Sequence, residues 1–141
     1  MFKNAIKKLT EEQQNAFDKI LLFLKDKQQN MFLLSGYAGT GKTFLSIRLV
    51  EYLASNISNQ ILICAPTNKA VKVLRQEIDQ IYLNTTFSTI HSALGLKEQV
   101  DGFGKIKFVP NKIIQNKIKG TNILILDEVS MLEDELFYYL I

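Results

Sequence analysis

Short continuous apolar runs alternate along the chain with longer stretches that have a helical period. The runs at residues 31–34, 60–65 and 121–126 predict buried strands, and Pro66 ends the second of them. Strands that are apolar throughout and alternate with helices are typical of a parallel sheet covered on both faces. The sequence therefore predicts an α/β domain. Its helices are expected at residues 10–25, 44–54, 68–82 and 133–141.

One stretch, residues 96–120, interrupts this alternation. Residues 100–104 resemble a hairpin turn, and residues 105–109 alternate between polar and apolar positions after it. Lysine outnumbers acidic residues here by six to two. The prediction is a single domain over residues 1–141 that carries a small basic insertion at residues 96–120.

Residues 36–43 fit the phosphate-binding pattern G-x-x-x-x-G-K-[ST] at every fixed position. A predicted strand precedes them and a predicted helix follows, so backbone N–H groups and the helix N-terminus would face one triphosphate. Lys42 would reach the β- and γ-phosphates of ATP, and the Thr43 hydroxyl would bind Mg²⁺. The alternative is a chance glycine-rich turn. The residues expected to hold the nucleotide here are Gly36, Ala38, Gly39, Thr40, Gly41, Lys42 and Thr43.

The third predicted strand ends in Asp127 and Glu128, which gives it the form of a Walker B strand. Asp127 would hold Mg²⁺ opposite Thr43, and Glu128 would polarise the water that attacks the γ-phosphate. The alternative is a solvated acidic strand end. With Lys42, these two carboxylates are the predicted catalytic residues. Because ligands of parallel sheets bind beyond the carboxyl ends of the strands, the loop, Thr67 and both carboxylates are expected to meet at one edge.

Bulk properties narrow the class of protein. The net charge of +3 is a weak hint of an anionic partner, and the single cysteine, Cys64, allows no internal disulfide. No secretion signal and no run of membrane-spanning length is present, which predicts a soluble cytoplasmic protein without membrane contact. The apolar final residues, 137–141, indicate a chain cut inside a larger protein; a terminal helix docked on its own core is the alternative.

With both nucleotide motifs in place, the chain resembles the first motor domain of a superfamily 1 helicase. It is most similar to the Dda-like and RecD-like members of superfamily 1B. This resemblance covers nearly the whole chain and implies a RecA-like fold, ATP hydrolysis and 5′-to-3′ movement on single-stranded DNA. In order, the matching segments are residues 9–13 (Q motif), 36–43 (motif I), 65–70 (motif Ia), 88–92 (motif Ib) and 127–131 (motif II).

The resemblance also implies roles for single residues. Gln13 would read the adenine; the alternative is that it only closes a capping box with Thr10. Thr67, Asn68 and Lys69 would contact single-stranded DNA through a helix N-terminus and one cation; the alternative is that Thr67 merely caps that helix.

Further along the chain, Thr89 and His91 would lie near the DNA strand, while a lone histidine is as often structural. The insertion at residues 96–120 matches the position of the pin that splits the duplex in these helicases. Phe103 at its tip would stack on a base, or else pack on the protein.

A partner is implied as well. In such helicases a second RecA-like domain of the same chain supplies an arginine to the transferring phosphoryl group, so the 141-residue piece alone is expected to hydrolyse ATP very slowly and not to unwind. Three alternatives stay open: a P-loop ATPase that does not act on nucleic acid, a nucleotide-binding scaffold module, and RNA in place of DNA.

Overall fold

A computed structural model describes residues 8–57, 59–78, 82–113 and 116–140, and the chain divides into two compact units, residues 1–49 and 50–141. In the first unit, helix α1 (Glu11–Lys25) begins with a capping box. The Thr10 hydroxyl accepts a hydrogen bond from the Gln13 N–H at 3.2 Å, and the Gln13 Oε1 accepts one from the Thr10 N–H at 3.0 Å. The predicted start of this helix is therefore confirmed.

The predicted first strand, at residues 31–34, is wrong: the structure assigns no strand there. Met31 and Leu33 are 64% and 72% exposed, while Phe32 packs on Phe23 of α1 at 5.6 Å between ring centroids. A strand requires a hydrogen-bonded neighbour, and the described residues of the first unit provide none. The segment is irregular chain that leads into the phosphate loop and then into α2 (Lys42–Asn56).

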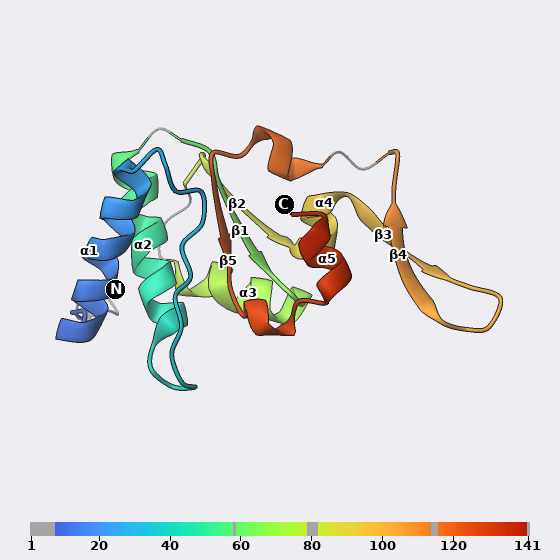
Figure 1. The fold of residues 1–141 in the computed structure, drawn as a ribbon, viewed down its shortest axis with the longest axis horizontal. Coiled ribbons are helices and arrows are strands. Elements are labelled where there is room, and N and C mark those ends of the chain that lie inside the picture. Colours follow the sequence, from blue (N-terminus) through green and yellow to red (C-terminus); the bar gives the residue numbers. More distant parts are fainter. Residues whose placement is uncertain (1–7, 58, 79–81, 114–115, 141) are drawn as a thin grey trace. The chain divides into compact units, whose positions relative to one another are not determined.

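The second unit is built on a parallel sheet with the strand order β2–β1–β5 (Figure 1). Ile61 at the start of β1 (Ile61–Ala65) lies opposite Thr85 of β2 (Thr85–Thr89) and Ile123 of β5 (Ile123–Leu126). All side chains of the central strand are buried. The predicted parallel α/β sheet is confirmed, with a strand, β2, that the apolar pattern did not indicate because its sequence is Thr-Thr-Phe-Ser-Thr.

The strand β5 is half-buried along its whole length, not fully buried as predicted. Among the described strands it pairs with β1 alone, so it forms an edge of the sheet. An apolar run predicts a strand but does not tell a central strand from an edge strand, and only the central one is covered on every side.

Helices cover both faces of this sheet. Helix α3 (Asn68–Glu77) buries Val71 and Leu74, and the Arg75 guanidinium lies 5.5 Å from the Phe87 ring on one face. The opposite face, which includes Leu62 and Cys64, packs on α4 (Ile90–Leu94).

Helix α3 ends at Glu77, not at residue 82 as predicted, and residues 79–81 lie outside the described part. Its ten residues span about 15 Å, close to the length of about 17 Å of a five-residue strand. A helix of this length is therefore long enough to return the chain along the sheet.

The insertion forms an antiparallel hairpin of β3 (Leu96–Val100) and β4 (Ile106–Pro110), which projects from the sheet in Figure 1. In its turn, Asp101 Oδ1 accepts hydrogen bonds from the N–H groups of Phe103 and Lys105, both at 2.9 Å, and Gly104 has a φ of 78°. The predicted hairpin is confirmed.

The chain continues through short 3₁₀ turns at Lys117–Gly120 and Val129–Met131 to α5 (Asp134–Tyr138). This last helix is shorter than the predicted 133–141, and residue 141 lies outside the described part. Among the described helices, none is long and apolar enough to cross a membrane.

Candidate functional site

The phosphate loop of the first unit closes around its own lysine. Lys42 Nζ donates hydrogen bonds to the carbonyls of Gly36 and Tyr37 at 2.7 and 2.8 Å, and Thr40 Oγ1 donates to the Tyr37 carbonyl at 2.7 Å. Gly39 and Gly41 have φ values of 78° and 82°, which side chains with a Cβ rarely adopt. An ammonium held by exposed carbonyls can exchange them for phosphate oxygens, which are stronger acceptors.

Gln13 connects the start of α1 to this loop. Its Oε1 caps the helix, while its Nε2 donates to the Thr40 carbonyl at 3.4 Å and lies against Gly41, where a Cβ would collide with it. The capping role expected from the sequence is confirmed. The adenine contact stays a prediction; Gln13 lies beside the phosphate loop.

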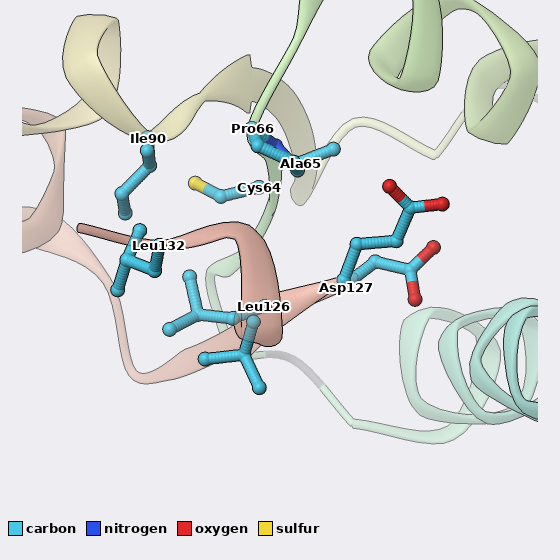
Figure 2. Close-up of a pocket in the computed structure, with 9 residues that line it drawn as sticks. Cys64, Ala65, Pro66, Ile90, Leu126, Asp127 and Leu132 are labelled. Carbon is cyan, nitrogen blue, oxygen red and sulfur yellow. The ribbon is translucent and has the colours of Figure 1, made fainter. Parts of the chain in front are cut away.

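The two carboxylates of the second unit follow the edge strand β5. The N–H of Asp127 donates to the Cys64 carbonyl at 2.9 Å, which continues the β1–β5 pairing past the last residue of the strand. In Figure 2, Cys64, Ile90 and Leu132 gather around a small hollow while the Asp127 carboxylate points away from them. At about 10 Å³ the hollow has room for roughly one water, so any larger ligand of the carboxylates would lie outside it.

Most residues that line the hollow are apolar, and Asp127 and Glu128 are the acidic residues among them. Burial raises the pKa of the Cys64 thiol to about 12, so the thiol stays protonated at neutral pH.

Glu128 has a left-handed backbone, with φ 52° and ψ 41°, and its side chain is exposed. A non-glycine residue in this region costs about 1–2 kcal/mol, and such strain gathers at functional sites. The sequence carries no signal for this conformation.

The chemistry of these donors fits Mg²⁺. The described residues contain no group of three or more metal-ligating side chains, and Mg²⁺ takes one or two carboxylates and completes its shell with water and phosphate.

Two helix starts lie at the same edge of the sheet as Asp127. The Thr67 hydroxyl accepts from the Ala70 N–H at 3.2 Å at the start of α3, where Asn68 and Lys69 are exposed. The Thr89 hydroxyl accepts from the Ser92 N–H at 3.2 Å at the start of α4. Both helices begin directly beyond the carboxyl ends of paired strands, so the edge combines helix N-termini with carboxylates.

The remaining predicted residues lie on and beside the hairpin. Phe103 is 99% exposed at the hairpin tip, so it does not pack on the protein. The His91 ring lies against Phe108 of β4, with 3.9 Å between centroids. Burial lowers the pKa of His91, although Glu133 and Glu98 act in the opposite direction. The phosphate loop and Gln13 belong to the first unit, and their meeting with the carboxylates stays a prediction.

Comparison with known proteins matches residues 19–141 to the AAA domain family. The ATP-dependent DNA helicase Dda of Enterobacteria phage T4 is 33% identical over 137 residues, which cover 94% of this chain and 28% of that protein. The RecBCD enzyme subunit RecD of Buchnera aphidicola is 28% identical over 145 residues, covering 92% of this chain and 23% of that subunit. The ATP-dependent helicase NAM7 of Saccharomyces cerevisiae is 32% identical over 92 residues, covering 65% of this chain and 9% of that helicase. This chain thus spans about a quarter of the length of the first two relatives.

Proposed function

We propose, since this chain belongs to the AAA domain family and resembles superfamily 1 helicases over most of its length, that it is the N-terminal ATP-binding motor domain of an ATP-dependent DNA helicase. One observation carries the proposal. The carboxylates Asp127 and Glu128 lie at the same sheet edge as the helix starts at Thr67 and Thr89. The helix starts at Thr67 and Thr89 supply backbone N–H groups that can bind the phosphates of a nucleic acid beside the carboxylates.

In this proposal the phosphate loop binds ATP through its backbone N–H groups and Lys42, with Gln13 at the adenine. Thr43 and Asp127 would hold Mg²⁺. When bound, the ion neutralises charge that develops on the β- and γ-phosphates. Glu128 is exposed and can orient the attacking water.

The strand of DNA would bind along the second unit. The first turn of α3 offers N–H groups and the Lys69 ammonium to a phosphate, and Thr89 stands at the neighbouring helix start. Phe103 at the exposed hairpin tip would stack on a base where the duplex parts. RNA offers the same phosphates and flat bases, so it is the alternative substrate; 5′-to-3′ movement rests on the resemblance to superfamily 1B.

Two further proposals concern the whole protein. The chain forms one motor domain, residues 1–141, with the hairpin region 96–120 as its pin, and a second RecA-like domain supplies the arginine that completes hydrolysis. A cytoplasmic location fits a single, buried and unpaired cysteine.

The test is ATP hydrolysis by the full-length protein with and without single-stranded DNA. We expect strong stimulation by DNA, and a loss of at least about a hundredfold in Lys42→Ala, because the variant lacks a charge that stabilises the transferring phosphoryl group. Lys72→Ala, which removes an exposed lysine of α3 outside the loop, is the matched control and should hydrolyse ATP normally. Turnover indifferent to DNA and RNA would leave an ATPase and remove the helicase.

A further inference from the structure

A single residue joins helix α4 to the hairpin. Gly95 is the only residue between α4 and β3, and it adopts a left-handed conformation with φ 72° and ψ 32°. Its N–H donates to the Ser92 carbonyl at 3.1 Å, and its carbonyl accepts from the Asn111 N–H at 2.8 Å, just past the end of β4. Both strands of the hairpin are therefore fixed to the end of α4.

A ring contact adds a second connection. The rings of His91 in α4 and Phe108 in β4 lie 3.9 Å apart between centroids at an interplanar angle of 35°. Phe108 also packs on the buried cluster that contains Leu62, Ala93 and Leu96. The His91 Nε2 is buried and has no hydrogen-bond partner among the described residues, so this atom does not face outward toward a ligand.

We propose that His91 is a positioning residue, which acts through Phe108 to hold the hairpin in a fixed direction relative to the helix start at Thr89. This inference rests on the proposed function, in which Thr89 lies by the nucleic-acid strand and Phe103 meets the duplex. Because Thr89 begins the same five-residue helix that carries His91, a force on the DNA strand at Thr89 would pass to the hairpin through α4, Gly95 and the contact of His91 with Phe108. His91 thereby favours strand separation without touching DNA.

The stack can be tested on the protein itself by hydrogen exchange of full-length variants. We expect His91→Ala and Phe108→Ala each to speed amide exchange in β3 and β4 by about fivefold, because an aromatic contact that orders both strands is lost. His91→Phe keeps a ring at this position and should exchange like the wild type. Phe87→Ala, which removes a half-buried aromatic from the other face of the sheet, controls for general loosening. Unchanged hairpin exchange in His91→Ala would overturn the inference.

The functional readout compares two activities of the same variants. His91→Ala and Phe108→Ala should slow strand separation on a forked duplex by about fivefold while ATP hydrolysis stimulated by single-stranded DNA changes by less than about twofold. His91→Phe should restore strand separation. If His91 instead contacts DNA through a ring nitrogen, His91→Phe will bind single-stranded DNA as weakly as His91→Ala, and the inference fails. If the wild type is not stimulated by nucleic acid, the proposed function fails, while hydrogen exchange still decides the stack.

Discussion

At the scale of single residues, the Gln13 amide shows how one side chain can serve two elements. Its oxygen completes the cap of α1, and its nitrogen donates to the carbonyl of Thr40 in the phosphate loop. A residue that only capped the helix would leave this nitrogen to solvent. The amide thus joins the start of α1 to the loop that would hold the phosphates.

The left-handed backbone of Glu128 predicts a trade between stability and activity. Glu128→Gly should raise the free energy of unfolding by about 1 kcal/mol, since glycine adopts this conformation without the steric cost, and should abolish ATP hydrolysis. Urea denaturation measures the first effect and phosphate release the second. Glu128→Gln keeps the strain and loses the carboxylate, so it should lose hydrolysis with unchanged stability. Equal stability of the two variants would contradict the argument.

His91 predicts a dependence of stability on pH. Because burial lowers its pKa in the folded state, the unfolded chain binds a proton more readily below the ordinary value of about 6.5. The free energy of unfolding should therefore fall as the pH drops from about 6.5 through the folded-state pKa, and the contribution is fully present above that range. Urea denaturation across this interval checks it. Subtracting the free energy of unfolding of His91→Phe at each pH removes the contribution of the other titrating groups. If the wild type and His91→Phe change in stability equally with pH, the prediction is wrong.

At the scale of elements, the sequence predicts local features but not which strands pair. Thr10 and Gln13 predict the capping box, and the Asp-Gly-Phe-Gly turn predicts the hairpin, because each feature is fixed by residues a few positions apart. The strand β2 is mostly polar and is not predicted, since it forms by pairing with β1. Residues 31–34 show the opposite case: they are apolar, which predicts a strand, but they have no paired neighbour among the described strands.

The candidate site divides along the same line. The phosphate loop, Asp127 and Thr67 follow from motifs that each lie within a few residues. The left-handed Glu128 and the stack of His91 on Phe108 could not be foreseen, because the first depends on how the chain leaves β5 and the second joins residues from different elements.

The junction between α4 and the hairpin depends on a single glycine. Gly95→Ala should lower the free energy of unfolding by about 1–2 kcal/mol, because a Cβ is strained at its φ of 72°. Gly102→Ala in the hairpin turn is the matched control, since its φ is not positive and an added Cβ there meets nothing within 4 Å. Urea denaturation of both variants measures the difference. A Gly95→Ala protein as stable as Gly102→Ala would show that the junction accepts a Cβ without strain.

At the scale of the whole molecule, the positive charge is concentrated in the insertion. The chain has a net charge of +3, and the hairpin region carries exposed lysines such as Lys105 and Lys112. If these face phosphates, binding of single-stranded DNA must weaken as salt rises, because bound cations are released.

Replacing both lysines by glutamine should reduce the slope of log affinity against log salt by about 1.4, from about 0.7 for each phosphate contact on a single strand. Fluorescence anisotropy with labelled DNA at several salt concentrations measures the slope. The Lys107 ammonium lies 3.9 Å from Asp101, so Lys107→Gln should change the slope less than either lysine. A slope that stays the same in the double variant would remove the hairpin from the DNA-binding surface.

The strand order β2–β1–β5 also sets an order of events during folding. The edge strand β5 pairs with β1 only after the chain closes a long loop. At the start of the two strands, the Asn122 side chain accepts a hydrogen bond from the Gln60 N–H, and 62 positions separate these residues. The hairpin forms from neighbours in sequence, within about 1–10 μs, and shortens the flexible part of that loop before it closes. A hairpin that folds early would then speed the pairing of β5 with β1, so variants whose hairpin forms slowly should also fold slowly.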